Sequence, residues 1–149
     1  MAEFLETTYD KFVFKVKNGF FYSRQDFWAD LQGDKATIGV SDLLQKAKGD
    51  VAFLEMVEVG TPVKQGEEAG KIETIKATFG ITSPVSGTIV EVNEELDAGS
   101  YLINEDPYGK GWIYKIEVTD FENDKKNLLQ PEAYFQLMKA KIAEEMKAK

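Results

Sequence analysis

The sequence predicts a mainly β domain, either a compact β-sandwich or a flattened barrel, with a short internal helix and a C-terminal helix. Between residues 50 and 92, strand-like runs alternate with Gly and Pro turns at roughly the 8–12-residue spacing of such folds. Capping signals indicate the internal helix, and apolar residues at four-residue spacing indicate the C-terminal one. At 149 residues the chain has the size of one domain. We divide it into an N-terminal strand pair (1–24), a core (25–118) and a C-terminal helical segment (119–149).

Two hairpins are expected near the N-terminus. Residues 12–16 have strand composition, Asn18-Gly19 is a strong turn signal, and residues 20–22 are predicted to return as the partner strand. We expect this pair to cover one end of the core. Residues 26–31 and 35–40 have the pattern of a second hairpin.

A short helix is predicted after the second hairpin. Ser41 is a typical N-cap, and Gly49 is a typical C-terminal stop. The intervening segment places Leu43, Leu44 and Ala47 on one side, which predicts a packing role.

The rest of the core is read from alternating patterns and turns. Residues 50–55 are a strand candidate, and Val63 is expected to point inward. Asp-Pro and Gly-x-Gly elements predict a compact loop over residues 101–112, after which residues 112–118 return to strand alternation. Residues 120–126 are predicted to be a polar connection.

The C-terminal segment has the pattern of an amphipathic helix. Pro131 can occupy its first turn, and Tyr134, Met138, Ile142 and Met146 recur at four-residue spacing between charged residues. A helix that packs on the core is the main expectation, and a helix that binds a partner is the alternative.

Composition excludes several kinds of function. The chain has neither cysteine nor histidine, so the commonest metal ligand, thiolate chemistry and the usual neutral-pH general base are missing. The net charge of −8 disfavours nucleic acid and favours a basic face on a partner protein. No apolar run approaches the ~20 residues of a membrane span. The acidic N-terminal residues are unlike a signal peptide. We therefore expect a cytoplasmic, monomeric protein without catalytic activity of its own.

The most informative stretch is Glu73-Thr74-Ile75-Lys76-Ala77-Thr78, which lies between two strand-like runs. A lysine at the tip of a hairpin is held in solvent on a rigid base. This is a suitable way to present an amine to a modifying enzyme.

This stretch and its flanks resemble the glycine-cleavage H-protein family, whose attachment motif reads Glu-Ser-Val-Lys-Ala. The resemblance extends over roughly residues 35–118 and is carried by several blocks in the same order. Besides the lysine motif, these blocks are residues 36–41, 49–51, 57–60, 64–67, 83–87, 90–94 and 103–112.

The resemblance implies a lipoyl-type barrel-sandwich hybrid of two antiparallel sheets, with lipoate attached covalently to Lys76. Lys76 would be modified by a lipoate ligase or lipoyl transferase. The cofactor-binding residues carried over with it are Glu73, Thr74, Ile75, Ala77 and Phe79. From their place near the lysine, Gly80, Pro84 and Gly87 are predicted to shape the turns of its hairpin. If Gly87 has positive φ, Gly87→Val should distort the attachment loop.

The chain also departs from the family pattern. Asp26-Phe27-Trp28 stands where glycine-cleavage members usually read His-Glu-Trp, and Lys76-Ala77-Thr78-Phe79-Gly80 stands where they often read Lys-Ala-x-Ser-Asp. Phe79 adds an apolar side chain beside the lysine. We predict that an apolar surface including Phe79, and Trp28 with it, receives the lipoyl group. The alternative is that both aromatics are core residues.

Three functions remain open at this point. The first is the aminomethyl carrier of glycine cleavage, with glycine decarboxylase, aminomethyltransferase and dihydrolipoyl dehydrogenase as partners. The second is a lipoate-binding protein that carries sulfur for a heterodisulfide-reductase-like sulfur-oxidation complex. The third is an unmodified family member that acts as a protein-binding or relay module.

Overall fold

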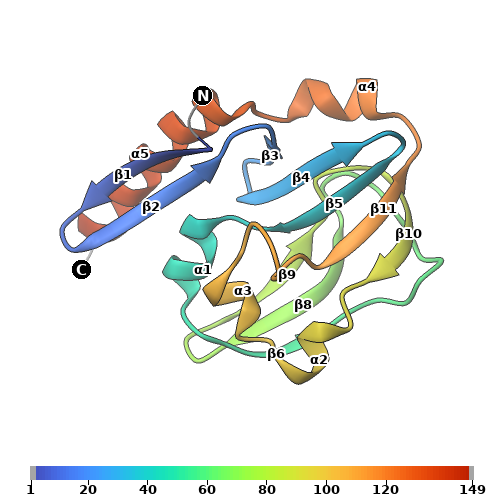
Figure 1. Cartoon of the computed structure of the whole chain (residues 1–149), viewed down its shortest axis with the longest axis horizontal. Coiled ribbons are helices and arrows are strands. Elements are labelled where there is room, and N and C mark those ends of the chain that lie inside the picture. The colour runs from blue at the N-terminus through green and yellow to red at the C-terminus, as the bar shows by residue number, and fades with distance from the viewer. Residues whose placement is uncertain (1–2, 148–149) are drawn as a thin grey trace.

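The computed structural model describes residues 3–147 and places two antiparallel sheets face to face, with a third pair of strands beside them (Figure 1). In spatial order, the large sheet contains β3 (Phe21–Tyr22), β4 (Phe27–Gln32), β5 (Lys35–Val40), β11 (Tyr114–Val118), β10 (Gly87–Val92) and β7 (Pro62–Val63). The small sheet contains β6 (Val51–Glu55), β8 (Glu68–Thr74) and β9 (Thr78–Thr82). The predicted mainly β fold of two antiparallel sheets is confirmed.

The main core lies between the large and small sheets. Ile38 and Ile116 point into it from the large sheet, and Ile72 and Ile81 from the small sheet; all four are fully buried. Alternation of inward and outward side chains explains why each strand contributes every second residue. Val63 is buried, as predicted.

The internal helix α1 (Asp42–Lys48) has the predicted ends. Ser41 Oγ accepts a hydrogen bond from the backbone N–H of Leu44 at 3.2 Å, and the N–H of Gly49 donates to Gln45 O at 3.1 Å. Gly49 has a φ of 89°, which a residue with a side chain rarely adopts. Leu43 and Leu44 are both buried. Leu44 packs in the main core, whereas Leu43 packs in a second core beside α5 (Pro131–Lys147), the C-terminal helix.

The N-terminal hairpin differs from the prediction. β2 (Phe12–Lys17) pairs with β1 (Phe4–Tyr9), whereas Phe21 pairs with Ala29 of β4. The two-residue turn contains Asp10 at a φ of 55°, a conformation that Asp tolerates. Residues 20–22 turn away because Phe20 stacks on Trp28, with ring centroids 4.7 Å apart.

A second core lies between this hairpin, α1 and the C-terminal helix α5 (Pro131–Lys147). Tyr134, Met138 and Ile142 are buried there, as predicted, against Phe14 and Val16 of β2. The side chain of Met146 lies outside the described part of the chain. Within residues 3–147, no helix is both long and apolar enough to cross a membrane.

The remaining elements are short helical turns. α2 (Glu95–Ala98) and α3 (Leu102–Glu105) follow β10, and α3 lies inside the predicted compact loop. The predicted polar connection over residues 120–126 instead contains α4 (Phe121–Asp124) and continues into the 3₁₀ turn η1 (Lys125–Asn127). Asp124 explains this local order, because its buried carboxylate accepts a hydrogen bond from the N–H of Ser86 at 2.7 Å.

Buried tyrosines lead us to expect that the fold loses stability at alkaline pH. Burial raises the pKa of Tyr114 to about 12 and also raises the pKa values of Tyr22, Tyr108 and Tyr134 above the ordinary value of 10.0. Folding therefore favours the neutral phenols. Their contribution is complete below a pH of about 10 and is lost as the pH rises from there through the folded pKa.

Above a pH of about 10, the free energy of unfolding should fall by up to about 1.4 kcal/mol per pH unit for each such tyrosine. Urea unfolding across this range measures the slope. Tyr114→Phe should reduce the slope, and Tyr101→Phe, at an exposed position, should leave it unchanged. Equal slopes in wild type and Tyr114→Phe would show that Tyr114 does not contribute.

Candidate cofactor-attachment site

Lys76 lies at the tip of the hairpin formed by β8 and β9, as the sequence predicts. Glu73 pairs with Thr78, and the N–H of Thr74 donates to Ala77 O at 2.8 Å, which closes the turn. Thr74 Oγ1 accepts hydrogen bonds from the N–H groups of Lys76 and Ala77, at 3.2 and 3.1 Å. The turn is therefore held by its own buried threonine.

The hairpin tip is also attached to the end of α1. The hydroxyl of Thr74 donates to Lys48 O at 2.6 Å, and the N–H of Ile75 donates to Asp50 O at 3.1 Å. These bonds fix the backbone on both sides of Lys76. The tip is thus a rigid platform, although it lies at the edge of the molecule.

The Lys76 side chain itself is exposed and weakly held. Its Nζ donates to Ala47 O at 3.4 Å, and among residues 3–147 it forms no ion pair within 4.0 Å. The lysine stem passes over Gly49, where a Cβ would lie 3.5 Å from Lys76 Cδ. Sequence reasoning assigned Gly49 only to the helix end and missed its place beneath the lysine stem.

The other predicted site residues differ in their surroundings. Glu73 and Ile75 are exposed, with Ile75 at 74%, whereas Thr74 is buried and Ala77 is half-buried. Thr74 is therefore a structural residue of the turn. Glu73 and Ile75 are available to a partner protein.

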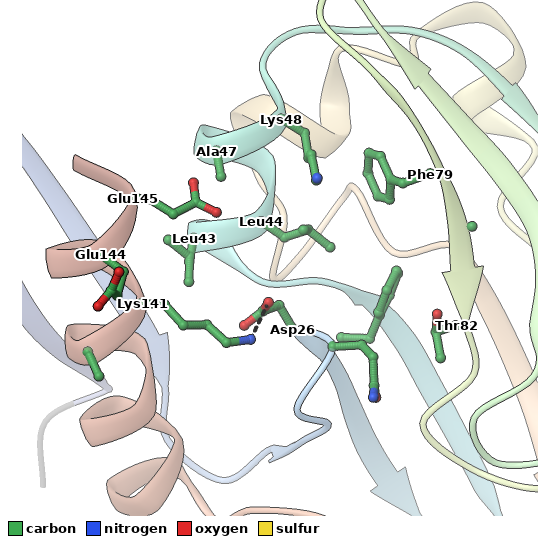
Figure 2. A pocket seen from close by; sticks show the side chains of 14 residues that line it. Asp26, Leu43, Leu44, Ala47, Lys48, Phe79, Thr82, Lys141, Glu144 and Glu145 are labelled. Atoms are coloured by element: carbon green, nitrogen blue, oxygen red, sulfur yellow. Dashed lines mark hydrogen bonds and ion pairs between the residues drawn. The ribbon is translucent and has the colours of Figure 1, made fainter. Parts of the chain in front are cut away.

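Phe79 lies in a groove of about 540 Å³ between β9, α1 and α5 (Figure 2). The side chain is half-buried and faces α1, with Lys48 Nζ 5.6 Å from the ring centroid. The apolar part of the groove is lined by Phe27, Leu43, Leu44, Ala47 and Phe79. Its other side carries charged groups, including the ion pair of Asp26 with Lys141 at 2.8 Å.

Trp28 is not part of this groove. It is only 1% exposed, lies in the second core, and its Nε1 donates to Pro107 O at 2.9 Å. Phe27 and Trp28 point to opposite faces of β4, so it is Phe27 that borders the groove. The prediction that Trp28 takes part in receiving the lipoyl group is wrong, and its core alternative is confirmed.

The glycine and proline assignments also need correction. Gly80 lies within β9 opposite Lys71, whereas Pro84 and Gly87 follow the end of β9 that is remote from Lys76. Gly87 does not have positive φ. It is required because a Cβ there would collide with the carbonyl oxygen of Glu117 on the neighbouring strand.

The structure is thus that of a small β domain that presents an exposed lysine at a fixed hairpin tip. The family model described as "Glycine cleavage H-protein" matches residues 20–141, more of the chain than the motifs alone indicated. The chain belongs to the glycine cleavage H-protein family.

Individual relatives agree with this assignment. The chain is 43% identical over 117 residues to the glycine cleavage system H protein of Carboxydothermus hydrogenoformans, covering 78% of this chain and 89% of the relative. It is 45% identical over 121 residues to a probable glycine cleavage system H protein of Aeropyrum pernix, covering 81% and 84%. A crystal structure of a glycine cleavage system H protein from Mycobacterium marinum matches with a TM-score of 0.71 at 30% identity, covering 80% of this chain and 95% of that one.

These relatives carry glycine-cleavage names, and they give no support to the sulfur-oxidation alternative. The family match begins at residue 20, so β1 and β2 lie outside it.

Proposed function

We propose that this protein is the lipoyl carrier of a glycine cleavage system, with lipoate joined to Lys76 by an amide bond at Nζ. The observation that carries the proposal is the position of Lys76. It lies in the family's attachment motif, at the tip of a hairpin whose backbone is fixed by Thr74. The protein would act as a carrier, and the catalysis would belong to its partner enzymes.

The residues around Lys76 suit an attached acyl chain. Amide formation removes the positive charge of the lysine, and this costs little because Nζ has only the 3.4 Å hydrogen bond to Ala47 O. That bond can persist after modification, because an amide keeps one N–H. Exposed Ile75 and Glu73 give a modifying enzyme an apolar and an acidic contact beside the amine.

When attached, a lipoyl group supplies a reversible disulfide that can bind a reaction intermediate. The lysine stem and acyl chain together contain about ten single bonds of ~1.5 Å each, so Lys76 can serve partner sites on the order of 10 Å from the hairpin tip. Tethering gives an effective concentration in roughly the mM range at a nearby site. The rigid tip is useful here because it fixes the centre of that range.

We further propose glycine decarboxylase, aminomethyltransferase and dihydrolipoyl dehydrogenase as the partners. Reconstitution tests this directly: the lipoylated protein, mixed with those enzymes, should support glycine-dependent NADH formation. Lys76→Arg should not. Failure with these enzymes, together with tight binding to a heterodisulfide-reductase-like complex, would overturn the glycine-cleavage assignment. The cytoplasmic location and the monomeric state stay predictions.

Phe79 is proposed to contact the acyl chain in the groove beside α1. Each buried CH₂ contributes about 0.8 kcal/mol before ordering costs, so a few such groups give a weak and reversible contact. In Phe79→Ala, the dihydrolipoyl thiols should therefore be alkylated faster than in wild type. Because Phe79 is half-buried against the main core, the same change should cost only about 1–2 kcal/mol, less than the 3–5 kcal/mol for a fully buried phenylalanine.

Phe53→Ala is the matched control for this measurement. Phe53 belongs to β6, is 59% exposed, and does not line the groove. Its removal should change neither alkylation nor stability appreciably. If Phe79→Ala lowers the melting temperature strongly while alkylation stays at the wild-type rate, Phe79 is a core residue and the contact is absent.

A further inference from the structure

The β1–β2 hairpin, which lies outside the family match, is firmly attached to α1. The N–H of Lys15 donates to Asp42 Oδ2 at 2.9 Å, and the hydroxyl of Tyr108 donates to Lys15 O at 2.6 Å. The ammonium of Lys46 in α1 donates to Val13 O. The position of the hairpin beside α1 is therefore defined, and Figure 1 shows the hairpin lying along α5.

This attachment creates a second recess, separate from the groove that contains Phe79. Its volume is about 150 Å³. The hairpin, α1 and α5 line it with Phe12, Phe14, Leu43, Lys46, Ala47, Ile142 and Glu145, and the remaining lining residue is Lys76 itself. Leu43 and Ala47 of α1 and Glu145 of α5 border both hollows, while Leu44 borders only the groove and Ile142 only the recess.

The recess wall contains an unusual exposed aromatic. Phe14 is buried, but Phe12, on the same face of β2, is 48% exposed, with its ring centroid 6.5 Å from that of Phe14. Besides Lys76, the charged residues that line the recess are Lys46, which pairs with Asp42 at 2.9 Å, and Glu145 of α5. The rest of the lining is apolar.

We propose that this recess is a second docking site for the lipoyl chain of Lys76. The proposal rests on lipoylation of Lys76, the function proposed above. Its occupant is specified by the tether, since Lys76 lies in the recess wall. A cavity of this size lined by Leu, Ile and Phe is large enough to hold a benzene ring, so a dithiolane ring or several methylenes fit.

The chain would then have two docking positions, the groove and the recess, on either side of α1. The hairpin would shield the chain from solvent and hold it close to Lys76. This device belongs to the part of the protein that the family match does not include.

Nuclear magnetic resonance of the full-length protein tests the site. The spectra of unmodified and lipoylated protein are compared, after peptide mapping has located the lipoyl group on Lys76. The Ile142 methyl and Phe12 ring signals should shift and show contacts to the acyl chain. Shifts confined to Leu44 and Phe79, or no contacts at all, would overturn the recess while leaving the carrier function intact.

A second form of the protein removes the dependence on lipoylation. The chain has no cysteine, so Lys76→Cys can be coupled at one position to an octyl disulfide. The Ile142 and Phe12 signals should again respond. If they respond here but Lys76 is never lipoylated, the apolar recess stands and the proposed function fails.

Phe12→Ala measures how much the recess protects the chain. The reduced lipoyl thiols should be alkylated several-fold faster in Phe12→Ala than in wild type. Val13→Ala is the matched control, because Val13 is similarly exposed, at 40%, on the opposite face of β2. Equal alkylation in Phe12→Ala, Val13→Ala and wild type would contradict the proposal.

Discussion

Lys76→Arg is expected to abolish lipoylation when the protein is co-expressed with a lipoate ligase. A guanidinium stays protonated at neutral pH and offers no nucleophilic amine, so no amide can form. The platform should survive, because Thr74 and Ile75 hold it through bonds that do not involve the Lys76 side chain. The free energy of unfolding should therefore change by less than about 0.5 kcal/mol.

Lys71→Arg is the control for that experiment. Lys71 is exposed on β8 of the same hairpin, opposite Gly80 and away from the tip. Full lipoylation of Lys71→Arg together with none of Lys76→Arg would locate the site. Transfer of the lipoyl group to another lysine in Lys76→Arg would show that the ligase recognises the surface and not this position.

Gly87→Val is expected to have the largest effect on stability. A Cβ at residue 87 of β10 would meet the backbone of Glu117 and, at 2.8 Å, Ile116 Cγ2 on the paired strand β11. Backbone atoms in a paired strand cannot move aside cheaply, so we expect a loss of at least about 3 kcal/mol. For a protein of this size, that corresponds to a melting temperature lower by roughly 6–12 °C.

The melting temperatures of Gly87→Val and Thr88→Val are compared. The comparison separates the steric clash at residue 87 from a general effect of placing valine in β10. Thr88 is the next residue of β10 and is already β-branched, so its change should be mild. Any Gly87→Val protein that still folds should be lipoylated normally, because residue 87 is remote from the hairpin tip. Slow lipoylation at unchanged stability would restore the turn role that the sequence suggested.

Local signals explain which elements could be predicted. The α1 boundaries follow from Ser41 and Gly49, and the β4–β5 hairpin follows from alternation around a glycine turn; both depend on residues that are neighbours in the chain. The lysine hairpin was predictable for the same reason. In all three, local preference and the final fold agree.

The incorrect predictions concern strand pairing and packing that depend on residues far apart in the sequence. Residues 20–22 were assigned to β2 by adjacency, but the aromatic face of Trp28 and a bridge from Tyr22 to Leu129 determine their partner. The sequence left Trp28 open between the lipoyl-binding surface and the core, because the acceptor of its indole N–H, Pro107 O, is distant in the chain. Gly87 looked like a turn glycine, although the reason for it is the approach of Glu117.

The recess beside Lys76 could not be predicted at all. It joins Phe12 near the start of the chain to Ile142 near its end, across α1. The sequence contains only the alternation that puts Phe12 and Phe14 on one face of a strand. Which element that face covers depends on the packing of the whole molecule.

Peptide mapping of the protein purified from its native host locates the lipoyl group directly. We expect one lipoyl group per chain, on the peptide that contains Lys76 and on no other. Protein that is unmodified there while the host's other lipoyl proteins carry the group, or that is modified at a different lysine, would contradict it.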